Sequence, residues 1–222
     1  MVLSARGDDS AAGSALEALC RGAWRPLYAF ARRWGLSRED AEDAVQGFMA
    51  TLLARRSLGN VVPGKGRFRS FLLAGMRNHL SDAQSRATAG KRGGGAVHFS
   101  LEADLAERGY AELAVEGESP ERAFERVWAM EIMSRSRDRL AEECAAGGKA
   151  AVFAALFPDA ANEPENYAAM SARLGLSETA LRSLAMRLRR RWRDLIRAEL
   201  AQTVSDRAAL EEEMTALRAA LA

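Results

Sequence analysis

Apolar residues recur every three or four positions along almost the whole chain, and this spacing constrains the fold more than any other feature. Residues spaced in this way lie on one face of an α-helix, whereas a half-buried strand alternates apolar and polar side chains. The first series is Leu16, Leu19, Ala23, Leu27, Phe30 and Trp34, and the second is Ala41, Val45, Phe48 and Leu52. We therefore predict an all-α fold.

Short polar segments predict where these helices begin and end. Gly35 follows the first series, and Ser37 with Asp40 three residues later resembles a capping box at the start of the second helix. Glycine and proline make residues 58–66 a loop. The Ser-Pro-Glu sequence at 119–121 is a favourable helix start, because serine can cap, proline suits the first helical position and glutamate favours the positive end of the helix dipole.

The helix predicted from Phe68 onward has two different faces. Its inward face comprises Phe68, Phe71, Leu72, Gly75, Met76, His79 and Leu80. The other face presents Arg69, Arg77 and Asn78. Positive charge mixed with aromatic and amide side chains suits single-stranded nucleic acid, although aromatics at helical spacing also pack in ordinary cores.

The segment from residue 167 to 197 predicts a helix-turn-helix. Tyr167–Leu174 has the pattern of a short helix, 175–177 that of a tight turn, and 178–197 that of a longer amphipathic helix. The core stripe of the longer helix is Leu181, Leu184, Leu188, Trp192 and Leu195. The face available to enter a major groove carries Thr179, Arg182, Ser183, Met186, Arg187 and Arg190, with Arg193 placed for phosphate contact.

Charge is segregated along the chain, although its net value is only +2. Residues 65–92 hold seven basic residues against one acid, and residues 177–197 hold seven arginines against two acids. Between them, residues 102–126 hold eight acids against three arginines. Two basic blocks that flank an acidic one suggest two contacts with a polyanion, joined by a segment that stays off it.

These features predict two helical domains joined by a flexible acidic linker, the C-terminal domain being the helix-turn-helix. We expect a flexible tail at 1–13, a first domain at 14–92, the linker at 93–119, a second domain at 120–200 and a helical extension at 201–222. The extension carries Leu210, Met214, Leu217 and Leu221 at spacings of four and three. It can dock on its own domain or contact another protein.

An enzyme is not expected. Neither His79 nor His98 has a partner at catalytic spacing, and the glycine-rich 59–66 loop has Gly66 where a phosphate-binding loop needs Ser or Thr. Cys20 and Cys144 form no metal or redox motif, so we expect no cofactor and no metal. No apolar run is long enough to span a membrane and residues 1–13 lack a signal-peptide layout, so we expect a cytoplasmic protein.

Two motifs resemble the extracytoplasmic-function group of bacterial sigma factors. Residues 40–48, read as Asp-Ala-Glu-Asp-Ala-Val-Gln-Gly-Phe, are similar to the helix with which the family grips the polymerase, and residues 66–72 with Arg77 and Asn78 resemble its −10 helix. Residues 167–193 are similar to its helix-turn-helix for the −35 element, although Leu184 stands where arginine is usual. The resemblance covers most of residues 15–200.

The resemblance implies a transcription initiation factor that directs core RNA polymerase to promoter DNA. Its partners would be the polymerase β and β′ subunits, promoter DNA and, as a further candidate, an anti-sigma protein. Polymerase contacts would be Asp40, Asp43, Gln46 and Phe48, and −10 contacts Arg67, Arg69, Phe71, Arg77 and Asn78. The −35 contacts would be Thr179, Arg182, Ser183, Met186, Arg187, Arg190 and Arg193.

Two alternatives stay open at this point. The first is a stand-alone helix-turn-helix regulator that dimerises through its C-terminal helix, which predicts a palindromic site bound without polymerase. The second is a helical adaptor that holds polymerase without initiating transcription.

Overall fold

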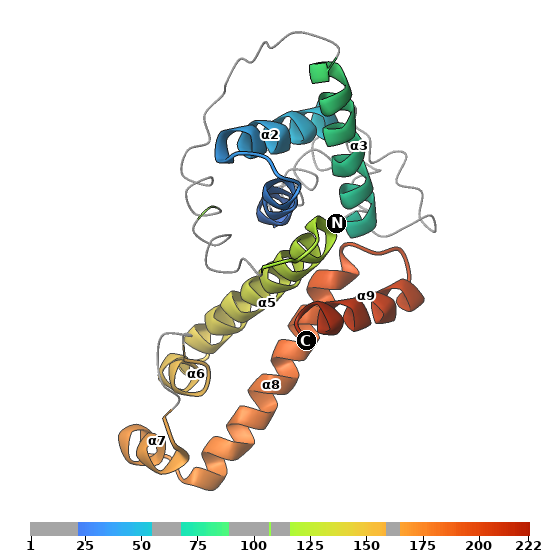
Figure 1. Ribbon diagram of the computed structural model, residues 1–222. Helices are drawn as coiled ribbons and strands as arrows, with labels where there is room; N and C mark the ends of the chain where they lie inside the picture. The colour runs from blue at the N-terminus through green and yellow to red at the C-terminus, as the bar shows by residue number, and fades with distance from the viewer. Residues whose placement is uncertain (1–21, 55–67, 89–106, 108–115, 159–164) are drawn as a thin grey trace. The chain divides into compact units, whose positions relative to one another are not determined.

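The computed structural model describes residues 22–54, 68–88, 107, 116–158 and 165–222. These residues form helices, turns and irregular chain, with no strand among them, so the predicted all-α class is confirmed for this part of the chain (Figure 1). A first helix is described over 22–33. The others are α2 (Arg38–Ala54), α3 (Phe68–Thr88), α5 (Pro120–Ala146), α6 (Ala150–Leu156), α7 (Tyr167–Leu174), α8 (Glu178–Ala201) and α9 (Arg207–Ala220).

The contacts divide the chain into two compact units. Unit 1 comprises Met1–Glu131 and Leu200–Ala222, and unit 2 comprises Ile132–Glu199. This grouping differs from the predicted domains, because the first turns of α5 and the whole of α9 belong with the N-terminal helices. The predicted tail at 1–13 and nearly all of the predicted linker lie outside the described residues.

The core of unit 1 is built from the apolar faces that the periodicity predicts. On α2 the buried side chains include Ala41, Val45, Phe48 and Leu52, and on α3 they are Phe68, Leu72, Met76 and Leu80, besides the polar Arg69. The two helices pack against each other, and Gly75 permits the contact, since a Cβ there would lie 2.9 Å from the Phe48 ring. Phe124 and Trp128 of α5 join this core, with the Trp128 ring 6.3 Å from that of Phe68.

The described residues of unit 2 include two small apolar clusters. Leu140, Cys144, Phe153 and Leu195 form one, and Ala155, Met170 and Leu181 form the other. Of the predicted core stripe of α8, Leu181 and Leu195 are fully buried, whereas Leu184, Leu188 and Trp192 are half-buried. The second cluster holds α7 against the start of α8. Among the helices of the described residues, none combines the length and apolarity that crossing a membrane requires.

Candidate functional site

The α7–turn–α8 segment is held together by local hydrogen bonds. Asn166 caps α7 by accepting from the Ala169 amide at 2.8 Å, and Gly175 ends that helix with a φ of 65°, a conformation that glycine adopts without strain. Ser177 then caps α8, its hydroxyl accepting from the Ala180 amide at 3.2 Å. The hydroxyl of Ser171 donates to the Leu176 carbonyl at 2.6 Å and fixes the turn between the two helices.

One face of α8 is exposed along several turns. All seven side chains predicted there are exposed: Thr179, Arg182, Ser183, Met186, Arg187, Arg190 and Arg193. Their spacing of mostly three and four residues places them on one side of the helix, opposite the buried Leu181 and Leu195. Met186 is 70% exposed, which is unusual for a large apolar side chain at the centre of a cationic face. A surface of this composition can offer donors to phosphates and to base edges, and an apolar contact to a methyl group.

Arg182 is oriented by two neighbours on this face. Its guanidinium carbon lies 4.5 Å from the centre of the Tyr167 ring, and Nη2 lies 3.1 Å from the Glu178 carboxylate. A guanidinium over an aromatic ring gains a cation–π attraction and keeps its edge directed outward. Arg182 is therefore partly preorganised while it stays exposed. Tyr167 was not among the residues predicted to lie on this surface.

The start of α2 forms an acidic surface. Asp40 and Asp43 are exposed, and Gln46 is half-buried. The hydroxyl of Ser37 accepts from the Asp40 amide at 3.1 Å and donates to its carboxylate at 2.7 Å, which confirms the predicted cap. Phe48 differs from its predicted role: it is 6% exposed and packs against α3, so in this structure it offers a partner almost no surface.

Arg69 is buried, which corrects its predicted position on the exposed face of α3. It is 8% exposed, and its Nε and Nη2 donate to the two carboxylate oxygens of Glu213 at 3.0 and 3.2 Å. Nη1 donates to Glu125 at 2.7 Å. Burial acts to lower the pKa of Arg69, but the hydrogen bonds and charges of both glutamates outweigh burial and raise it. The guanidinium is thus permanently charged and fully engaged within unit 1.

The other predicted residues on and before α3 are in mixed environments. Arg77 and Asn78 are exposed and Phe71 is half-buried, whereas Arg67 lies outside the described residues. Arg77 makes an ion pair of 2.6 Å with Glu121 at the start of α5. Burial alone would raise the pKa of Glu121, but the hydrogen bonds from the backbone and from Arg77 prevail and lower it below 4.5.

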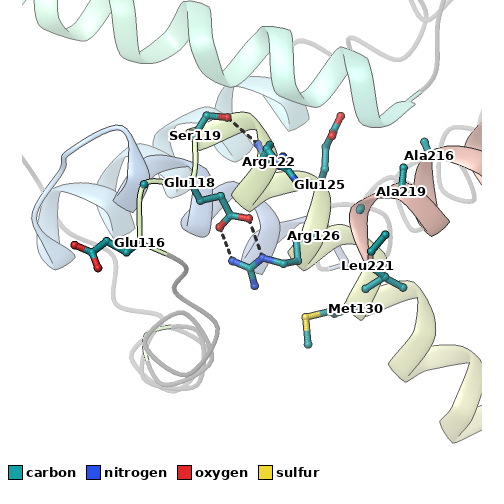
Figure 2. Close-up of a pocket in the computed structure, with 13 residues that line it drawn as sticks. Glu116, Glu118, Ser119, Arg122, Glu125, Arg126, Met130, Ala216, Ala219 and Leu221 are labelled. Carbon is teal, nitrogen blue, oxygen red and sulfur yellow. Dashed lines mark hydrogen bonds and ion pairs between the residues drawn. The ribbon is translucent and has the colours of Figure 1, made fainter.

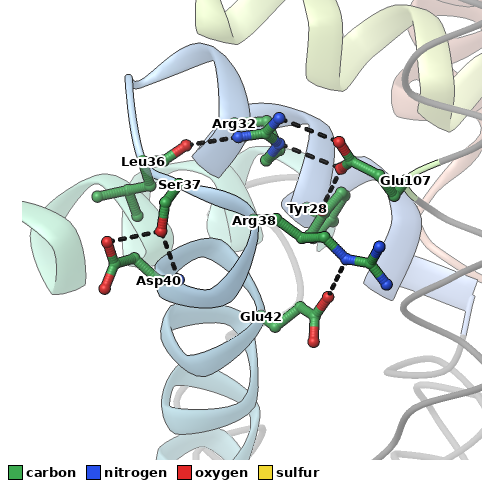
Figure 3. A network of polar contacts seen from close by, with 8 residues as sticks. All are labelled: Tyr28, Arg32, Leu36, Ser37, Arg38, Asp40, Glu42 and Glu107. Carbon is green, nitrogen blue, oxygen red and sulfur yellow. Dashed lines mark hydrogen bonds and ion pairs between the residues drawn. The ribbon is translucent and has the colours of Figure 1, made fainter.

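A second polar network joins the predicted acidic linker to the first helix (Figure 3). Tyr28 donates its hydroxyl to the Glu107 carboxylate, and Arg32 donates to both oxygens of that carboxylate at 3.0 and 3.1 Å. Burial and the hydrogen bond to Glu107 raise the pKa of Tyr28, so the phenol stays protonated. Arg32 also donates to the Leu36 carbonyl at 2.8 Å, beside the start of α2. Glu107 is therefore bound to the first helix by two side chains.

An open groove of about 1290 Å³ lies between the start of α5 and the end of α9, within unit 1 (Figure 2). Charged side chains of the α5 segment form one wall, where Arg126 is paired with Glu118 at 2.6 Å. Ala216 and Ala219 of α9, and Leu221 just after it, contribute to the lining as well. The groove therefore borders the C-terminal half of α9.

Sequence reasoning missed the acidic partners of the predicted cationic residues. Glu213 lies 144 positions from Arg69, and Glu121 lies 44 positions from Arg77. No local pattern links residues so far apart. In the sequence, these glutamates look like any other acidic residues of a helix. Two basic side chains assigned to the −10 contact are therefore paired within the chain.

Comparison with known proteins identifies no relative. The chain matches no family model, no curated protein and no solved structure. Among the described residues, no group of three or more His, Cys, Asp or Glu side chains is arranged to hold a metal ion.

Proposed function

We propose that the protein is a sigma factor that binds core RNA polymerase and directs it to promoter DNA. In this proposal, α7, the turn and α8 form a helix-turn-helix whose second helix enters the major groove of the −35 element. The observation that carries the proposal is the exposed face of α8. The seven side chains predicted to contact bases and phosphates are all exposed there. The first turn of this helix is fixed by the Ser177 cap and by the apolar contacts with α7.

The acidic start of α2 supports the polymerase half of the proposal. Exposed Asp40 and Asp43 suit a basic partner surface, and Gln46 can add a hydrogen bond. In this proposal Phe48 does not contact the polymerase. It packs α2 on α3 and so fixes the direction of the Asp40 and Asp43 carboxylates. The −10 contact would begin with Arg77 and Asn78, which are exposed on α3.

The stand-alone regulator is less well supported. It needs the apolar stripe of α9 for dimerisation, yet Met214 and Leu217 are 7% and 8% exposed because they pack within unit 1. A dimer built on this stripe would first have to remove α9 from its own unit. We therefore propose that the chain acts with polymerase and does not bind DNA as a dimer through α9.

The proposal is tested by separating base contact from phosphate contact on α8. Arg182→Ala should cost about 1–3 kcal/mol of binding free energy on the preferred sequence and relax sequence preference. Arg193→Ala should weaken binding to all sequences alike and lower the slope of log affinity against log salt by about one. Footprinting and salt titration with the polymerase complex measure both. Equal effects of the two variants on every sequence would refute the assigned division.

A further inference from the structure

The buried cluster around Arg69 joins three helices of unit 1 that are far apart in sequence. Arg69 is the second residue of α3, Glu125 lies in α5 and Glu213 lies in α9. The Glu213 carboxylate is 2% exposed and binds the guanidinium through both oxygens. The adjoining backbone is also attached, because the Phe68 amide donates to the Thr203 carbonyl at 3.2 Å. The segment that leads into α9 and α9 itself thus cover the beginning of α3.

A bidentate pair of this kind is a weak choice for stability alone. Two charges lose their hydration on burial, and apolar residues of similar size often serve as well or better. The fork of a guanidinium fits a phosphate as well as it fits a carboxylate. The place that Glu213 fills on Arg69 is therefore one that a phosphate group would also fit.

The α9 helix is held in unit 1 by few buried apolar side chains. Its buried residues are Glu213, Met214 and Leu217, so two apolar side chains are buried along a helix of 14 residues. A cavity of about 10 Å³, room for roughly one water molecule, lies beside the ion pairs. Trp128 lines that cavity, and its indole N–H has no hydrogen-bond partner among the described residues. The end of α9 borders the open groove of Figure 2.

We infer that α9 is an intramolecular competitor for the nucleic-acid surface of α3, with Glu213 holding Arg69 until a single strand displaces the helix. This inference rests on the proposed function and adds a regulated state to it. The short connection from Thr203 to the Asp206 cap keeps α9 beside its seat, so the displaced helix can return when the strand leaves. The predicted −10 residue Arg69 is then a contact that becomes available only in the opened state.

The test measures binding of a fluorescein-labelled single-stranded 20-nucleotide DNA to the full-length chain. Glu213→Gln keeps the size of the side chain but removes its charge, and it should tighten binding several-fold. Glu212→Gln removes the same charge from the exposed neighbouring residue and is the matched control, with binding unchanged. In an Arg69→Ala chain, Glu213→Gln should produce no gain. Tighter binding that persists without Arg69 would overturn the inference.

Hydrogen exchange in the unaltered protein tests the same inference without a variant that could fail to fold. Saturating oligonucleotide should increase amide exchange across α9 and protect the start of α3. Unchanged protection of α9 in the bound state overturns the inference. Equal binding by the unaltered chain and Glu213→Gln overturns the inference alone, whereas no binding by any variant, with or without core polymerase, overturns the proposed function as well.

Discussion

The contact between α2 and α3 allows a prediction whose magnitude follows from a comparison of two glycines that both lie inside helices. Gly47 lies inside α2 and Gly75 inside α3, so replacing either with alanine should gain about 1 kcal/mol of helix stability. Their surroundings differ. A Cβ at Gly47 would meet His79 at 3.5 Å, which is an ordinary contact, whereas a Cβ at Gly75 would lie 2.9 Å from two carbons of the Phe48 ring.

That short distance must be relieved by moving the ring, because carbon atoms pack at roughly 3.5–4.0 Å. The Phe48 ring is nearly fully buried, so its movement disturbs the core, and overpacking of this kind costs about 1–3 kcal/mol. Gly47→Ala should therefore stabilise the protein by about 1 kcal/mol. Gly75→Ala should be neutral or destabilising by up to about 2 kcal/mol once its own helix gain is subtracted.

Native-state hydrogen exchange of the α2 and α3 amides is the suitable assay, because two contact units need not unfold in one step. Phe48→Leu replaces the ring with a smaller side chain, so it should remove most of the destabilisation caused by Gly75→Ala. A double-mutant cycle detects this effect as a favourable coupling free energy between the two substitutions. If Gly75→Ala proved as stabilising as Gly47→Ala, the proposed close packing of α2 on α3 would be refuted.

Three further predictions concern single contacts. In equilibrium titrations, Tyr167→Ala should cost about 0.5–1 kcal/mol of DNA-binding free energy, whereas Tyr167→Phe should cost none. The difference between these two variants should vanish in an Arg182→Ala background. A difference that persists in that background would contradict the cation–π role. The pKa of Glu121 is lowered in the folded state, so the ionised carboxylate stabilises the protein above pH 4.5, and this stabilisation is lost as the pH falls through the folded-state pKa. Arg77→Gln should raise the pKa of Glu121 in an NMR carboxyl titration. An unchanged pKa would contradict the pairing. Asp206→Ala removes the cap of α9 and should destabilise this helix by about 0.5–2 kcal/mol, measured as faster amide exchange at its start; unaltered exchange would contradict the cap.

The features that the sequence predicts well are local. The caps at Ser37 and Ser119 form as expected, because each depends on residues within three positions. The buried faces of α2 and α3 also follow the predicted spacing, since one helical face is set by neighbours three and four residues apart. The exposed face of α8 follows from the same rule.

The misplaced residues depend on contacts between distant helices. Arg69 follows the helical rule for an outward position, but Glu213 of α9 meets it there and buries it. Phe48 belongs to a motif chosen for polymerase binding, yet the same spacing that made it part of an apolar stripe places it in the core. No local sequence pattern around Glu107 predicts that it binds Tyr28 and Arg32. Local periodicity cannot predict which faces meet.

The central claim is tested most directly by mixing the purified chain with sigma-free core RNA polymerase at moderate ionic strength. Association is measured by pull-down, and transcript 5′ ends are mapped on genomic fragments. The account predicts a stable complex that starts transcripts at discrete sites, and it predicts loss of the complex in a chain that carries Asp40→Asn and Asp43→Asn. A folded, unaltered chain that fails to associate with core enzyme would contradict the claim.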